Sequence, residues 1–443
     1  MKLINKKASK MQNVLITIYF FLAIFKPNFC SISTRTIMFF VNLLIIAFHL
    51  LCVKGQMQVS VSLLSTIISF VPFFLYYTIV QIIHYITNIS TVSSDLYISL
   101  LYPIFMTFLQ SFIGLIAIYI LYCNIGVSEK NFYKNLFYAI LVQLICVLLA
   151  FFVPSIKDFF LEIIIKYSES ETISNAIRVF RRYRCYGFSS NLFDAFGYTT
   201  SILITIVFAV GVSKKQTSYV TFAMIMLIIP LLNARTGLVL CIVGFGVVLC
   251  YHFNIKTYLK YLVMAIFVVI IFAGIINRIG GSLKEWINIG IDETILFLTK
   301  GDTSSGLYGQ LFGEDLVFPE DIWLGAGASP EDLGAYTGID VGYIQCIWRF
   351  GILGTVILFF GYINMYRIVY KKCVGTLDKS IVVSTLLIFF IYLIKLYSIQ
   401  NSSGNALIFG IPAIILAKHK TYVYHHSHVR TNFQKGTEGE LCK

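Results

Sequence analysis

Charged residues are scarce in this 443-residue chain, since Asp, Glu, Lys and Arg together make up only 12% of it. A soluble domain carries about 25%, so the scarcity argues against an ordinary soluble globular protein. Hydrophobic residues account for 58% of the chain, and the mean hydropathy is +0.82. The composition therefore indicates an integral membrane protein, most of which is embedded in the bilayer.

Features that would signal a cofactor or a disulfide framework are also missing. The ten cysteines include no C-x-x-C pair and mostly lie in apolar runs, where cysteine behaves as a small hydrophobe. No Gly-rich phosphate loop is present, and the histidines of the tail HKTYVYHHSHVR lack carboxylate or thiol partners. A disordered tail is favoured over a metal site there. We expect no disulfide scaffold, no metal and no nucleotide.

The net charge of +13 would suit a nucleic-acid partner, but the hydropathy argues against one. Basic residues in such a chain normally lie on cytoplasmic loops. The expected surroundings are thus membrane lipids, and no nucleic acid is expected as a partner.

The hydropathy pattern predicts an all-α polytopic membrane protein with about twelve transmembrane helices in a single membrane domain, 1–443. A spanning helix needs about 20 apolar residues. The first candidate follows KKASK and resembles a signal sequence without a cleavage site, so it is interpreted as an uncleaved span. The twelve predicted spans are 12–29, 36–53, 60–86, 97–122, 135–156, 196–212, 217–233, 236–253, 258–276, 339–366, 379–398 and 404–417.

The distribution of Lys and Arg predicts which loops face the cytoplasm. With the N-terminus inside, most basic residues fall on inside loops or on the cytoplasmic tail 418–443, as the positive-inside rule requires. Both termini are then cytoplasmic, and two long loops, 157–195 and 277–338, lie outside. The basic residues assigned to the inside are Lys2, Lys6, Lys7, Lys10, Lys54, Lys130, Lys134, Lys214, Lys215, Lys256, Lys260, Arg367, Lys371, Lys372, Lys379, Lys418, Lys420, Arg430, Lys435 and Lys443.

Arginines on the outer side depart from this bias and need a reason. Arg235 lies in a predicted five-residue hairpin, NARTG, between two spans. It could be an interfacial anchor that snorkels toward the headgroups, or it could bind an anion at the membrane surface. Asn233 and Thr236 add hydrogen-bonding groups beside it, and Gly237 would let a ligand approach the backbone closely.

A second group of outer arginines lies in ISNAIRVFRRYRCYGFSSN, residues 173–191. The pattern looks helical, with Arg178, Arg181 and Arg182 on one face, while Arg182 and Arg184 lie nearest a Tyr186-Gly187-Phe188 turn. The planar guanidinium suits phosphate oxygens. A basic helix resting on anionic headgroups is the alternative, but a basic cluster on the outer face favours a phosphate-bearing ligand.

The second long loop combines acidic and aromatic residues, which suit either a sugar-binding surface or a small folded cap. At its end, Asp340 lies at the outer start of a span, where it is a candidate general base or an N-cap. Arg349 lies deeper in the same span and must face a partner or a cavity.

Taken together, these motifs resemble those of the bacterial O-antigen polymerase (Wzy) and O-antigen ligase superfamily. The similarity covers about 60 residues; elsewhere only the topology is alike. The stretch from Arg182 to Asn191 is similar to an arginine-glycine-asparagine stretch before a middle span. Arg235 and Gly237 match a small-polar-Arg-x-Gly hairpin. The run from Asp340 through Gly342 and Tyr343 to Gly354 resembles a late-span motif.

The resemblance implies a GT-C-like glycosyltransferase of the bacterial cytoplasmic membrane that needs no cofactor. Its donor would be a growing glycan on undecaprenyl diphosphate, and its acceptor a single lipid-linked repeat unit. A chain-length regulator and a flippase would be its protein partners. Asp340 and Arg235 would be catalytic. The residues expected to bind diphosphate or glycan are Arg178, Arg181, Arg182, Arg184, Asn191, Asn233, Arg278 and Tyr343.

Two alternatives remain at this point. Ligases of the superfamily use a histidine in the large outer loop, but neither long outer loop contains one, and His84 is the only outside candidate. A flippase or other transporter would instead carry charges within its spans and have short outer loops. The two long outer loops and the few intramembrane charges, of which Arg349 and Lys395 are the clearest, favour a polymerase.

Overall fold

A computed structural model describes residues 2–27, 32–52, 60–87, 95–125, 133–167, 184–190, 192–252, 316–333 and 341–420, together with isolated positions between 259 and 299. Throughout this part of the chain the regular elements are α-helices, and seven of them are long and apolar enough to cross a membrane. The protein is thus an all-helical, polytopic membrane protein, as its composition predicts.

The described helices follow one another along the chain, with two long intervals after α7 and after α12. They are α1 (Lys2–Phe25), α2 (Thr34–Cys52), α3 (Val61–Ile68), α4 (Val71–Thr87), α5 (Asp95–Ile125), α6 (Lys134–Phe152), α7 (Pro154–Lys166), α9 (Phe193–Ser213), α10 (Thr217–Met226), α11 (Ile228–Asn233), α12 (Arg235–Tyr251), α16 (Gly342–Lys371), α17 (Thr376–Lys395) and a last helix over residues 402–420.

Most predicted spans coincide with these helices, and the differences have local causes. The long span 60–86 is two helices, α3 and α4, separated at Ser69 and Phe70. The last helix is longer than predicted and extends over 402–420, so the tail begins later than residue 418. The predicted span 258–276 lies almost entirely outside the described residues.

The first of the two long loops that the charge pattern predicts to lie outside begins with a helix that the hydropathy pattern does not predict. Helix α6 ends at Phe152, and Pro154 is the first residue of α7. Proline has no N–H to donate and stops a preceding helix, but it is well tolerated at a helix start. The predicted span 135–156 is therefore shorter by one turn, and α7 packs on α6 through Leu161 and Ile164.

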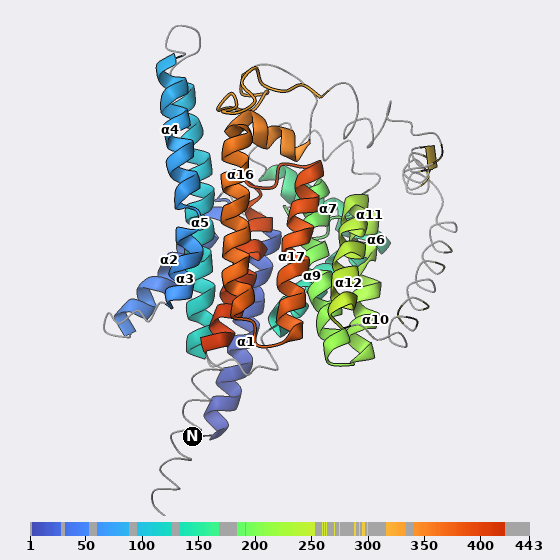
Figure 1. Ribbon diagram of the computed structural model, residues 1–443. Coiled ribbons are helices and arrows are strands. Elements are labelled where there is room, and N and C mark those ends of the chain that lie inside the picture. The colour runs from blue at the N-terminus through green and yellow to red at the C-terminus, as the bar shows by residue number, and fades with distance from the viewer. Residues whose placement is uncertain are drawn as a thin grey trace, which may run out of the picture.

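Burial separates a central helix from peripheral ones. In α9, 94% of the span is buried inside the protein, whereas in α2 only 17% is. Helices α12 and α17 pack along α9, and α2 lies with α5 toward the opposite edge of the bundle (Figure 1). A helix that is apolar all round and almost fully covered forms the core, so α9 is the element around which the others are arranged.

Close packing between α9 and α12 explains why residue 237 is a glycine. A Cβ at Gly237 would lie 2.9 Å from the Gly197 Cα and 2.7 Å from the Pro230 Cβ. Small residues let membrane helices approach closely. The idea that Gly237 leaves room for a ligand is therefore wrong, because the space is filled by α9.

The end of the bundle that the charge pattern assigns to the cytoplasm gathers basic side chains. Lys418 forms an ion pair with Asp378 at 2.9 Å, and the Tyr133 hydroxyl donates to the same carboxylate at 2.8 Å. Lys134 and Lys214 line a small cavity beside Lys418. Residues predicted to share one side of the membrane thus lie at one end of the bundle.

Reporter fusions test which side this end faces. We expect fusions after Ser170 and Asp302 to behave as exported, and a fusion after Lys215 to behave as cytoplasmic, because basic loops are retained inside. Paired phosphatase and fluorescent-protein reporters measure this. A cytoplasmic signal at Asp302 would invert the assignment of every outer residue named above.

Helix α16 is broken near its start, and part of the segment 316–333 fills the break. Gly351 has φ 66° and ψ 177°, which interrupts the helical ladder. The freed N–H groups of Ile352 and Leu353 donate to the carbonyls of Ile322 and Trp323 at 2.9 and 3.3 Å. Backbone polar groups at membrane depth must be satisfied within the protein, so residues 316–333 are a structural partner of α16.

Residues 316–333 also resolve part of the choice between a folded cap and a sugar-binding surface. Leu316, Ala326 and Leu333 pack on Val341, Ile344 and Trp348 to form a small core of their own. Phe318 and Trp323 nevertheless remain 42% and 58% exposed. This segment is a folded cap, and the prediction that its exposed aromatic rings contact sugar stays a prediction.

Substitution of Gly351 by alanine is expected to destabilise the protein strongly. The new Cβ would overlap the Trp323 carbonyl, and alanine strongly disfavours a positive φ. We expect a loss of about 3 kcal/mol or more in stability, measured as reduced accumulation and a lower melting temperature in detergent. Gly246→Ala in α12 is the control, since nothing lies within 4 Å of its Cβ position. Equal melting temperatures for the two variants would contradict the proposed role of the break.

Candidate functional site at the predicted outer end of the bundle

The stretch 184–190 crosses the predicted outer end of the bundle and is hydrogen-bonded to the last residue of α1. The Ser189 hydroxyl and the Ser190 N–H both donate to the Phe25 carbonyl, at 3.0 and 3.1 Å. Gly187 has φ 62°, and a Cβ there would lie 2.9 Å from the Gln143 amide nitrogen. The chain bends at Phe188 rather than forming a regular turn, and a glycine is needed at residue 187 for both reasons.

A hydrogen bond joins this stretch to the NARTG sequence. The Cys185 N–H donates to the Asn233 side-chain oxygen at 2.8 Å, and the Asn233 amide nitrogen donates to the Ile229 carbonyl at 2.8 Å. Asn233 is fully buried. The two arginine-bearing motifs are therefore neighbours, and Asn233 holds them together; this intramolecular role differs from the ligand contact predicted for it.

The predicted hairpin is tighter than its five-residue sequence indicates. Helix α11 ends at Asn233, Ala234 alone is extended at φ −155° and ψ 108°, and α12 begins at Arg235. Arg235 is thus the first residue of a helix. The unpaired N–H groups and the macrodipole make a helix start electropositive, so the backbone at Arg235 favours a nearby anion whatever its side chain contributes.

A carboxylate and a lysine that were not predicted as site residues lie beside this helix start. The Thr236 hydroxyl donates to one oxygen of Asp194 at 2.6 Å, and Lys395 approaches the other oxygen at 3.9 Å. These residues come from α12, α9 and α17. Each side chain of the pair is about one-quarter exposed, 24% for Lys395 and 25% for Asp194, so both can be reached from outside the protein.

The late-span motif, at the start of α16, packs on the end of α17, which also carries Lys395. A Cβ at Gly342 would overlap the carbonyl of Leu396, so the start of α16 packs directly on that chain segment. The Arg349 guanidinium stacks over the Tyr397 ring at 5.1 Å and pairs with Asp332 at 3.4 Å. The expectation that Arg349 faces a partner is confirmed. Residues Lys395–Tyr397, which we call the α17 terminus, thus contact both Asp194 of α9 and the start of α16.

Arg184 is the member of the arginine cluster whose surroundings are described. Its guanidinium lies 5.0 Å from the centroid of the Phe193 ring and donates to the Tyr186 hydroxyl at 3.1 Å. Burial raises the pKa of Tyr186 to about 12, so its hydroxyl stays neutral and does not cancel the arginine's charge. Phe193 itself has φ 53°, an uncommon conformation for an aromatic residue that is often associated with functional sites.

The remaining predicted site residues are only partly placed. Tyr343 lies in the first turn of α16 and is partly buried. The structure describes the backbone of Arg235 as the start of α12. The N-cap of α16 is Val341, so the alternative role of Asp340 as that cap is wrong. The residues outside the described part of the chain are Arg178, Arg181, Arg182, Asn191, Arg278 and Asp340.

The site as a whole is electropositive for three structural reasons. The first turns of α9, α12 and α16 converge there, and each contributes a partial positive charge. Arg184, Arg349 and Lys395 add formal charges, two of which are partly offset by Asp332 and Asp194. Within the described residues, no group of three His, Cys, Asp or Glu side chains could hold a metal ion. The arrangement is suited to a phosphate-bearing ligand rather than to a cation.

Sequence reasoning missed the role of the α17 terminus. Lys395 is recognisable as a charge at the end of an apolar run, and Asp194 as an acidic residue in the first turn of a span, but nothing in either run predicts that they meet. Comparison of the chain with protein-family models, with curated proteins and with solved structures finds no match.

Proposed function

We propose that the protein is a membrane glycosyltransferase of GT-C-like organisation that polymerises glycan repeat units on the outer face of the bacterial cytoplasmic membrane. The donor is a growing glycan on undecaprenyl diphosphate, and the acceptor is a lipid-linked repeat unit. The observation that supports this best is the linkage of three motif stretches: 184–190 bonds to 233–237 through Asn233, and 233–237 and 341–349 both lie beside the α17 terminus. These are the stretches whose sequence resembles the polymerase and ligase superfamily.

The proposed reaction requires positive charge where the diphosphate leaves. As the acceptor hydroxyl attacks the anomeric carbon, the bond to the donor's diphosphate breaks and negative charge grows on the leaving oxygen. Fixed cations and helix starts that surround such an oxygen stabilise the transition state. Arg235, Arg184 and Lys395 take this role in the proposal, and the first turn of α12 adds its backbone N–H groups.

A general base must also remove the acceptor's proton. In the sequence Asp340 immediately precedes Val341, the N-cap of α16, and Gly342 of the same helix start packs on Leu396. Asp194 and Asp332 are less suited, because each is engaged by a cation, and Asp194 also by Thr236. We therefore assign the base to Asp340 and a positioning role to Asp194.

One observation supports transport as a second candidate function. Discontinuous helices that expose backbone groups near bound substrate are common in secondary transporters, and α16 is discontinuous at Gly351. In this chain, however, the groups freed by the break bond to residues 316–333. Polymerisation remains the stronger proposal because the break is filled by protein.

Deletion of the gene in its own bacterium separates the candidate functions. A polymerase mutant would display single repeat units on its surface in place of a long ladder. A ligase mutant would retain polymer on the lipid carrier, and a transporter mutant would retain single units on the cytoplasmic side. Gel analysis of surface glycan, combined with extraction of the lipid carrier, measures all three. An unchanged ladder would contradict all of them.

A further inference from the structure

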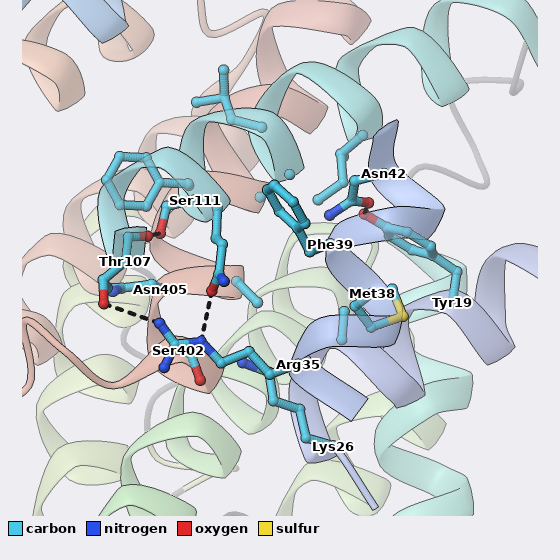
Figure 2. A pocket seen from close by; sticks show the side chains of 18 residues that line it. Tyr19, Lys26, Arg35, Met38, Phe39, Asn42, Thr107, Ser111, Ser402 and Asn405 are labelled. Carbon is cyan, nitrogen blue, oxygen red and sulfur yellow. Dashed lines mark hydrogen bonds between the residues drawn. The ribbon is translucent and has the colours of Figure 1, made fainter. Parts of the chain in front are cut away.

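A separate pocket, seen from close by in Figure 2, is lined by residues of α2 and α5. It has a volume of about 60 Å³ and is bordered by α1, α2, α5 and the helix 402–420. Lys26, immediately after α1, and Arg35, in the first turn of α2, both line it. By the predicted topology both cations lie at the outer ends of their helices, at headgroup depth.

The pocket concentrates positive charge without a carboxylate. None of the residues that line it is acidic. The Arg35 guanidinium is held in place by Gln110 at 2.6 Å and Thr107 at 3.1 Å, both of which are neutral. Lys26 and Arg35 are both partly buried, and two neighbouring cations at such a site attract an anion.

The backbone at Lys26 points to a selected side chain. Lys26 has φ 45° and closes α1 with a hydrogen bond from its N–H to the Leu22 carbonyl at 3.1 Å. Glycine is the usual residue in the left-handed conformation after a helix, and asparagine is the next best tolerated. A lysine at this position is strained, and the strain is understandable if its ammonium group is needed in the pocket.

The surroundings indicate where an anion would come from. The polar side chains of Thr107, Ser111, Ser402 and Asn405 lie in the pocket together with the apolar Met38 and Phe39 (Figure 2). Farther along α2, Phe40, Leu44 and Phe48 are 58%, 67% and 70% exposed. A largely uncovered apolar helix faces lipid, so the pocket adjoins the acyl chains of the outer leaflet.

We propose that Lys26 and Arg35 form a binding site for the phosphate group of an anionic lipid, which enters from the bilayer beside α2. The cations contact phosphate oxygens, Ser402 and Asn405 lie near the rest of the headgroup, and Met38 and Phe39 contact the first acyl carbons. The site is distinct from the α17 terminus and does not depend on polymerase activity. Ser189 and Ser190, which bond to Phe25, connect its edge to the stretch 184–190.

The test is lipid binding to the purified full-length protein in detergent, followed by native mass spectrometry. The probes are phosphatidylglycerol, diacylglycerol with the same acyl chains, and inorganic phosphate. We expect one tightly bound phosphatidylglycerol, with much weaker binding of diacylglycerol and of free phosphate. Lys26→Asn and Arg35→Gln should each weaken phosphatidylglycerol binding roughly tenfold, the size of one charge-assisted hydrogen bond.

The variants are chosen so that loss of folding cannot imitate loss of binding. Asparagine tolerates the conformation of residue 26, so Lys26→Asn should keep the wild-type melting temperature. Lys166→Gln, which removes an exposed lysine of α7 on the same predicted side, is the matched control and should bind phosphatidylglycerol normally. Wild-type affinity in Lys26→Asn, or equal weakening in Lys166→Gln, would overturn the site. Competition by inorganic phosphate at the same concentration as lipid would show that the site binds free phosphate rather than a lipid headgroup.

Discussion

Replacement of Arg235 by lysine is expected to abolish most glycan polymerisation, and replacement by alanine essentially all of it. The arginine begins α12 next to the Asp194–Lys395 pair. A guanidinium fork can bridge two phosphate oxygens, whereas an ammonium group acts as a point charge. Loss of a group that stabilises charge in the transition state typically costs about 10²–10³-fold in rate. Glycan length on a gel, from a deletion strain carrying each variant, measures the effect.

The lysine variant also separates diphosphate binding by Arg235 from the simpler role of an interfacial anchor. Lysine snorkels as arginine does, so an anchor should tolerate Arg235→Lys. Arg367→Lys, near the end of α16 that is predicted to face the cytoplasm, is the matched control and should leave the ladder unchanged. Full-length ladders from Arg235→Lys would show that this residue is only an anchor.

Neutralisation of Asp340 is the second change for which we expect a large effect. If this carboxylate accepts the proton of the attacking hydroxyl, Asp340→Asn should lower polymerisation by about 10²–10⁴-fold while the protein still accumulates in the membrane. The N-cap of α16 is the neighbouring Val341, so the substitution removes no helix cap. Glycan length and immunoblots of membranes measure the two quantities.

The control for this variant removes a carboxylate from the same outer loop. Glu320 is exposed and lies in the described segment 316–333, so Glu320→Gln should leave the ladder intact. Near-normal chain length in Asp340→Asn would refute its role as the base. The base would then have to be sought among the other carboxylates of the second outer loop.

Hydropathy predicts most of this fold because the bilayer imposes a simple rule on composition. Runs of apolar residues long enough to cross the membrane must form helices, and most of the predicted spans appear as helices. The breaks are not predictable in this way. The run 60–86 stays apolar across Ser69 and Phe70, and the run through Gly351 stays apolar across the kink in α16, so a sum of hydropathies does not register the change in backbone dihedral angles.

The candidate site is predictable only as separate pieces. A charge within an apolar span indicates that Arg349 needs a partner, but Asp332 lies in a loop, and no local pattern connects the two. Likewise, the meeting of Asp194, Thr236 and Lys395 depends on how three helices are rotated about their axes. Such contacts arise from tertiary packing, which single-sequence periodicity does not encode.

Reconstitution of polymerisation is the most direct test of the proposed function. Lipid-diphosphate-linked repeat units would be extracted from the deletion strain and incorporated into liposomes with the purified protein. We expect the wild-type protein to convert single units into a ladder without added nucleotide or metal, and Arg235→Ala to leave them as single units. Wild-type protein that is folded and correctly inserted but leaves the units unjoined would contradict the proposal.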